Sequence, residues 1–105
     1  MKVQKEQVSR HIINDRADRL AIIGATVGFG EKVLRERYSP DKESWSCFMD
    51  SGCVLIWSKD KSKLVTGFIP RREQVMWIYG HPINRAIEKL VTNAQVKYFK
   101  GLQKA

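Results

Sequence analysis

Two apolar runs joined by a lysine-rich turn lie at the centre of the chain. They fall within Cys53–Pro70, as Val54–Trp57 and Leu64–Ile69, with the turn at Ser58–Lys63. Val, Ile, Thr, Phe and Trp favour a pleated, half-buried surface, so each run is predicted to be a strand. Because an isolated hairpin is only marginally stable, the rest of the chain must supply further strands and at least one helix.

Further strands are predicted on both sides of this hairpin. Glu43–Met49 alternates in polarity and is followed by the turn Asp50-Ser51-Gly52, while Gln74–Tyr79 provides a fourth strand. Four successive strands with short turns form an antiparallel meander. The strand 74–79 is also expected to be an edge, whose apolar VMWIY run suits pairing with a protein partner or with a second copy of the chain.

Helices are predicted before and after the sheet. Residues 4–21 carry apolar side chains at helical spacing, and Glu31–Tyr38 is expected to form a second, shorter helix. The glycines of Gly24–Gly30 are expected to break the first helix and precede the second. After the sheet, residues 83–103 show an apolar stripe at 3–4 spacing and a basic face.

These elements are expected to form one α+β domain over residues 1–105. It comprises N-terminal helices within 4–38, a four-stranded antiparallel β-meander within 43–79, and the basic C-terminal helix 83–103 packed on the sheet. No apolar run approaches the ~18 residues of a membrane span, and no signal peptide is evident. We therefore expect a cytoplasmic protein without a membrane partner.

The chain is strongly basic, with a net charge of +8. This balance suits a polyanion, and we expect RNA as the first candidate and DNA as the second. The candidate phosphate contacts lie in the hairpin turn, in the corner after it and on the last helix: Lys59, Lys61, Lys63, Arg71, Arg72, Arg85, Lys89, Lys97 and Lys100. The alternative is a merely solvated cationic helix face. Exposed aromatics among Trp45, Trp57, Trp77 and Tyr79 would favour single strands through base stacking, although most are expected in the core.

Two side chains of the first predicted helix are candidates for chemistry. Arg16 lies within the apolar face, between Ile12 and Leu20, and His11 lies at its edge, one turn before Asp15. Arg16 is expected either to reach water or a carboxylate with its head, or to clamp a phosphate. His11 either bonds to Asp15 or acts as an acid or base near neutral pH.

We expect neither a metal nor a cofactor. Cys47 and Cys53 are predicted to be free, buried thiols rather than a disulfide. The two histidines, His11 and His81, show no metal-site spacing with each other or with the cysteines, and no carboxylate cluster suited to Mg²⁺ stands out.

The order of elements resembles a loose group of small ribonucleases. The opening Ser9–Leu20 is similar to a start in which a His is followed several residues later by an Arg, and Leu64–Phe68 is similar to a Thr-containing run in a late strand. The group comprises RelE-type and barnase/EndoU/colicin-like ribonucleases, many of them toxins or proteins of phages and other mobile elements. The resemblance covers roughly residues 8–79.

The resemblance implies an RNA-directed protein, either a metal-independent endoribonuclease or an inactive relative. By it, His11, Arg16 and Thr66 are the catalytic candidates, and Lys59 or Arg71 contacts phosphate. In such cleavage a histidine serves as acid or base, an arginine stabilises the developing charge, and a threonine orients a phosphate oxygen. Two alternatives stay open: a non-catalytic nucleic-acid-binding module, and a phage-type protein-interaction or inhibitor factor.

Overall fold

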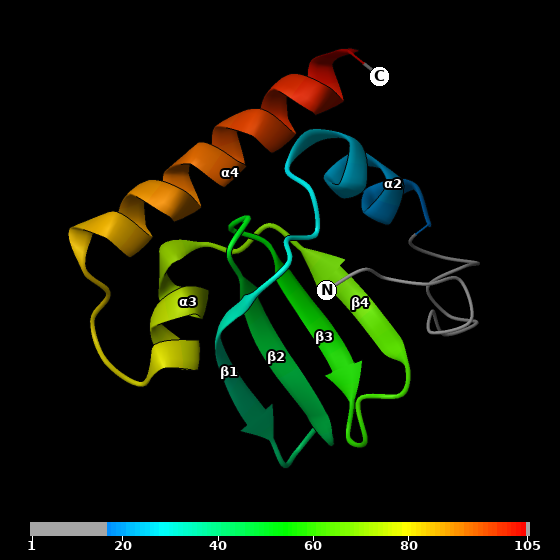
Figure 1. Ribbon diagram of the computed structural model, residues 1–105, viewed down its shortest axis with the longest axis vertical. Helices are drawn as coiled ribbons and strands as arrows, with labels where there is room; N and C mark the ends of the chain where they lie inside the picture. Colours follow the sequence, from blue (N-terminus) through cyan, green and yellow to red (C-terminus); the bar gives the residue numbers. More distant parts are fainter. Residues whose placement is uncertain (1–16, 105) are drawn as a thin grey trace.

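The computed structural model describes residues 17–104, in which it places three helices and four strands (Figure 1). The elements follow in the order α2 (Ala17–Thr26), β1 (Val33–Ser39), β2 (Ser44–Met49), β3 (Val54–Ser58), β4 (Leu64–Phe68), α3 (Arg72–Tyr79) and α4 (Arg85–Lys104). The strands form one antiparallel sheet in the order β1-β2-β3-β4. The predicted α+β class with a four-stranded antiparallel meander is therefore confirmed.

The central hairpin forms as predicted, from β3 and β4. Ile56 pairs with Thr66, and the backbone N–H of Ser58 donates to the carbonyl of Lys63 at 2.9 Å, which closes the turn. Within the turn, the carboxylate of Asp60 accepts a hydrogen bond from the hydroxyl of Ser58 at 2.8 Å. Local hydrogen bonds of this kind help to order a polar turn.

The predicted second helix, Glu31–Tyr38, is wrong, because this segment contains the edge strand β1. Pairing with β2 sends successive side chains to opposite faces, and charged side chains find partners on both. Glu36 binds Lys61 at 2.7 Å on one face, and the guanidinium of Arg37 stacks on Trp77 on the other. These partners are distant in sequence, so tertiary pairing overrides the local helix preference of the Leu, Arg and Glu side chains.

The predicted fourth strand, Gln74–Tyr79, is also wrong, because these residues belong to helix α3. The helix begins where the side chain of Gln74 accepts a hydrogen bond from the backbone N–H of Arg71 at 2.7 Å. It ends at Gly80, whose φ of 78° suits glycine and turns the chain away. The edge strand that was expected to pair with a protein partner is therefore not present.

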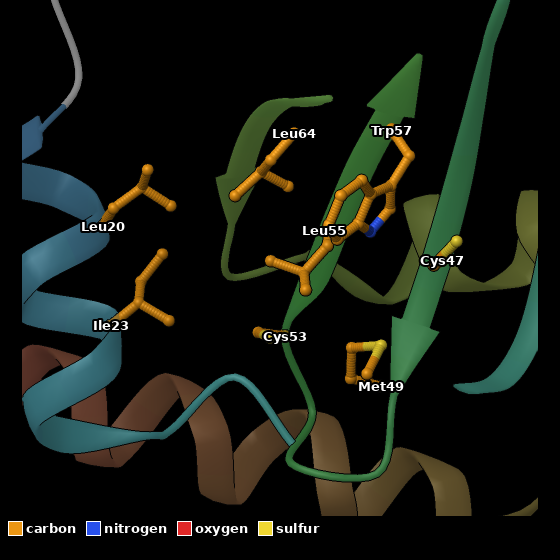
Figure 2. Close-up of a cluster of buried hydrophobic side chains, with 8 residues drawn as sticks. All are labelled: Leu20, Ile23, Cys47, Met49, Cys53, Leu55, Trp57 and Leu64. Atoms are coloured by element: carbon orange, nitrogen blue, oxygen red, sulfur yellow. The ribbon is translucent and has the colours of Figure 1, made fainter. Parts of the chain in front are cut away.

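Helices cover both faces of the sheet. On one, the α2 face, Leu20 and Ile23 of α2 pack onto a buried cluster from the sheet and its turns (Figure 2): Cys47, Met49, Cys53, Leu55, Trp57 and Leu64. On the other, the α3 face, Val75 and Ile78 of α3 pack onto Phe48. Because side chains alternate along a strand, neighbours such as Cys47 and Phe48 enter different clusters.

Helix α4 confirms the predicted C-terminal helix, and it lies across one end of the sheet (Figure 1). Val91 packs in the cluster of the α3 face, and Ala94 lies against Gly52 in the β2–β3 turn. Farther along, Gly101 lies against Thr26 of α2. Contacts with both helical layers and the sheet therefore fix the orientation of α4.

The predicted helix 4–21 overlaps the described chain only in its last turn, and the remainder lies outside the described residues. Helix α2 continues past the expected break at Gly24 and ends at Thr26. Gly28 and Gly30, with φ of 83° and 84°, then lead the chain into β1. Among residues 17–104, no helix is long and apolar enough to cross a bilayer.

Candidate functional site

A groove of about 690 Å³ lies on the α3 face, where α3 covers β1 and β2 and leaves part of the sheet uncovered. Five of its lining residues carry hydroxyls: Ser39, Ser44, Ser46, Ser58 and Thr66. Five others are apolar or aromatic: Ile56, Val65, Phe68, Trp77 and Ile78. Apolar walls with a few polar groups are typical of small-molecule sites.

Strand register brings these side chains together. Ser46 pairs with Ile56, and Ile56 pairs with Thr66, so the three lie in one row across β2, β3 and β4. Arg37 of β1 pairs with Ser46 and extends the row toward α3. Directly paired residues project to the same face, so Arg37 belongs to the surface that borders the groove.

Trp77 is an exposed aromatic whose position is fixed from β1. Its side chain is 43% exposed, whereas Trp57 is 3% exposed and Trp45 and Tyr79 are half-buried. The guanidinium carbon of Arg37 lies 4.5 Å from the centroid of the Trp77 ring, and Arg37 Nη1 donates to the Trp77 carbonyl at 2.6 Å. This stacking and hydrogen bond hold α3 to β1.

The predicted catalytic residues are not brought together within the described chain. His11 and Arg16 lie outside the described residues. Thr66 lines the groove on the α3 face, whereas α2, which begins at Ala17, packs on the opposite face. Thr66 Oγ1 is buried and has no hydrogen-bond partner, so in this conformation it does not present its oxygen to a ligand.

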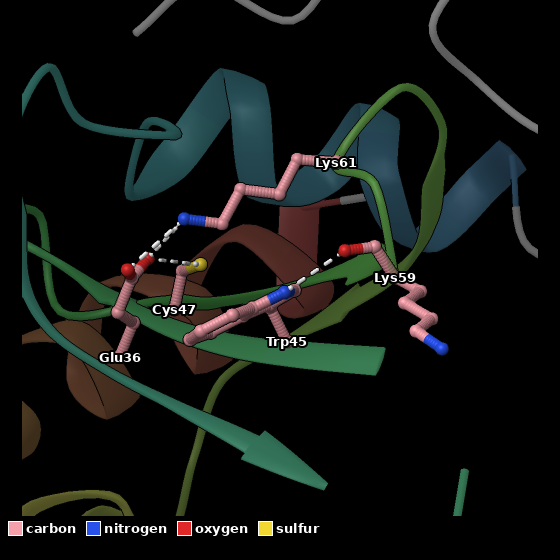
Figure 3. A network of polar contacts seen from close by, with 5 residues as sticks. All are labelled: Glu36, Trp45, Cys47, Lys59 and Lys61. Atoms are coloured by element: carbon pink, nitrogen blue, oxygen red, sulfur yellow. Dashed lines mark hydrogen bonds and ion pairs between the residues drawn. The ribbon is translucent and has the colours of Figure 1, made fainter. Parts of the chain in front are cut away.

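Of the predicted phosphate contacts, Lys61 is engaged within the protein (Figure 3). Its Nζ lies 2.7 Å from Glu36 Oε2 and 4.5 Å from the centroid of the Trp45 ring. Trp45 Nε1 in turn donates to the carbonyl of Lys59 at 3.0 Å. These contacts fasten the hairpin turn to the sheet, so Lys61 has a structural role, while the side chains of Lys59 and Lys63 are exposed.

The remaining predicted phosphate contacts gather at the other end of the sheet, around α3 and α4 (Figure 1). Four of them lie on the side of α4 away from the buried Val91, and we call them the α4 basic face: Arg85, Lys89, Lys97 and Lys100. Arg71 and Arg72 lie at the start of α3, and all six side chains are exposed. Among the described residues, the one ion pair that these six cations make is between Arg72 and Glu88, at 3.9 Å.

Cys47 and Cys53 are free and buried, as predicted. Burial raises the pKa of each thiol to about 11. Cys47 Sγ lies 3.7 Å from Glu36 Oε2 (Figure 3), which disfavours the thiolate further. Neither cysteine is therefore a nucleophile at neutral pH. Among residues 17–104, no group of three or more His, Cys, Asp or Glu side chains is placed to hold a metal ion.

The arginines of β1 were not among the residues predicted from the sequence. Arg35 lies 5.7 Å from the ring centroid of Tyr79, whose ring lies 5.7 Å from that of His81. Burial raises the pKa of Tyr79, and the nearby Arg35 opposes this to a lesser extent. The charges at Arg35, Glu36 and Arg37 alternate in sign, and a strand over Val33–Ser39 places the two arginines on one face and the glutamate on the other.

Comparison with known proteins identifies no relative: no protein-family model, no curated protein and no solved structure matches the chain. The geometry of the two surfaces, the groove and the α4 basic face, therefore carries the functional argument.

Proposed function

We propose that this protein binds RNA through the α4 basic face together with Arg71 and Arg72. The observation that carries the proposal is that six exposed cations gather on α4 and at the start of α3. Among the described residues, the one ion pair that these cations make joins Arg72 to Glu88. Basic side chains that contact phosphates release the cations condensed on the nucleic acid, which gives affinity without base specificity. RNA rather than DNA as the target, and a cytoplasmic location, belong to the same proposal.

Binding of the wild-type protein to single-stranded RNA is expected to weaken steeply with salt. If four to six of these cations contact phosphates, the slope of log K against log salt is roughly −3 to −4. The measurement is fluorescence anisotropy of a labelled oligonucleotide between about 50 and 200 mM salt. A slope near zero, or no binding at the lowest salt, contradicts the proposal.

A second candidate function is metal-independent RNA cleavage in the groove. The observation that favours it is that Leu64–Phe68 is β4, the last strand of the sheet, and that its Thr66 lines the groove. This matches the late Thr-containing strand of the RelE-type and barnase-like ribonucleases that the sequence resembles. The buried oxygen of Thr66 counts against the candidate, and we therefore rank it second.

Thr66→Val is expected to raise the free energy of unfolding by about 1 kcal/mol, because it removes a buried hydroxyl that has no partner. Urea unfolding monitored by circular dichroism measures this change, and a loss of stability contradicts it.

The same variant, Thr66→Val, tests the second candidate function in a cleavage assay with a chelator present. If the wild-type protein cleaves RNA and both Thr66→Val and His11→Ala abolish cleavage, the second candidate function is supported. Equal cleavage by all three proteins rejects Thr66 and His11 as catalytic residues.

A further inference from the structure

We propose that the groove on the α3 face receives one unstacked ribonucleotide base, which stacks on Trp77. This inference rests on the proposed RNA binding and names the part of the RNA that the groove takes. Bases of single-stranded RNA bind proteins largely by stacking on aromatic side chains and by hydrogen bonds at their edges. The groove offers both, and its volume of about 690 Å³ lies within the range of small-molecule sites.

Trp77 provides the stacking surface. Its side chain lines the groove and is 43% exposed, although a tryptophan gains by burial. Arg37 holds the residue in place through the ring contact at 4.5 Å and the 2.6 Å bond to the carbonyl. The indole is therefore ordered before any ligand binds, which lowers the entropy cost of stacking a base on it.

Serine hydroxyls provide donors and acceptors for the base edge. Those of Ser39 and Ser46 belong to half-buried residues that line the groove, and they make no hydrogen bond with another described residue, whereas Ser44, which also lines the groove, is only 5% exposed. An aliphatic ligand would strip water from these hydroxyls and leave them unpaired, which costs free energy. A flat heteroaromatic ring with polar edges pairs with hydroxyls and with apolar walls at once.

Charge favours a nucleotide over a neutral ring. Arg37 borders the groove and Lys42 lines it, opposed by Glu43. At the other end of α3, Arg71 bonds through its backbone to Gln74, which also lines the groove. At about 1.5 Å per residue, Trp77 lies roughly 8–9 Å along α3 from the Arg71-Arg72 corner. A strand whose phosphates lie on that corner therefore has a base within reach of Trp77.

The experiment compares Trp77→Leu with the wild-type protein, using a single strand of about ten adenosines and an RNA duplex of the same length. The variant is expected to bind the single strand about tenfold more weakly and to keep its duplex affinity and salt slope. Trp77→Phe, which retains a ring, is expected to recover most of the loss. Phe99→Leu is the matched control, because Phe99 is 65% exposed on α4, outside the groove. A Trp77→Leu protein that binds the single strand as tightly as wild type overturns the inference.

A second measurement separates this inference from the proposed function. The indole N–H resonance of Trp77, assigned by its absence in Trp77→Leu or Trp77→Phe, is followed as adenosine 5′-monophosphate is added at millimolar concentration. A saturable shift of this resonance supports the base site even if the protein binds neither oligonucleotide, in which case only the proposed RNA binding fails. An unmoved Trp77 resonance overturns the base site, and it does so even if the α4 basic face binds RNA.

Discussion

Replacing all four residues of the α4 basic face by glutamine is expected to remove most of the RNA affinity of the protein. Removing one phosphate contact lowers the steepness of the salt dependence by about 0.7 for single strands, so the slope should fall by nearly 3. The fold should survive, because the four side chains are exposed and glutamine is a good helix former. Anisotropy titrations across a salt series measure both affinity and slope, and circular dichroism verifies folding.

Two double variants distinguish a local surface from overall charge. Lys89→Gln with Lys100→Gln, and Lys59→Gln with Lys63→Gln, each remove two positive charges from exposed positions. The two pairs belong to α4 and to the turn between β3 and β4, which lie at opposite ends of the sheet (Figure 1). The α4 pair is expected to lower the slope by about 1.4 and the hairpin pair to leave it unchanged. Equal losses of affinity from both pairs would mean that net charge, rather than the α4 basic face, drives binding.

The sequence predicts correctly those segments whose local preference for a strand or a helix agrees with the structure that they adopt in the fold. Val54–Ser58 and Leu64–Phe68 are rich in β-branched and aromatic residues and pair with each other in the sheet, so propensity and pairing agree. In Gln74–Tyr79 the strand propensity and the observed structure disagree. The VMWIY run favours a strand by composition, but Gln74 at the start and Gly80 at the end mark a helix.

These two errors explain why the groove could not be predicted. With 31–38 taken as a helix, nothing placed Arg37 next to Trp77, forty positions later in the chain. With 74–79 taken as a strand, nothing distinguished Trp77 from the other three candidate aromatics, most of which were expected in the core. Thr66, a catalytic candidate from the sequence, lines the groove, whereas Lys61, predicted to bind phosphate, is held by Glu36 because β1 lies beside β2. A pattern identifies charged residues, but the fold decides which of them have internal partners.

Gly101→Ala is expected to destabilise the protein, although alanine is the better helix former. A Cβ at this position would collide with Cγ2 of Thr26 in α2. Thr26 cannot easily rotate away, because its hydroxyl donates to the carbonyl of Ile22 at 2.6 Å. Overpacking costs about 1–3 kcal/mol, against a gain of roughly 1 kcal/mol in helix propensity. The free energy of unfolding, measured in urea, should therefore fall by up to about 2 kcal/mol.

The sign of this effect should reverse when Thr26 is trimmed. Thr26→Ser removes Cγ2 and keeps the hydroxyl bond to Ile22, so adding Gly101→Ala to that variant should be neutral or stabilising by up to about 1 kcal/mol. Gly52→Ala is the control: its φ of 97° and the approach of the Leu90 carbonyl to within 3.0 Å of a new Cβ make it destabilising in both backgrounds. If Gly101→Ala costs the same with and without Thr26→Ser, the contact between α2 and α4 does not fix the end of the helix. The α4 basic face would then have to be oriented by the other contacts of α4, such as those of Val91 and Ala94.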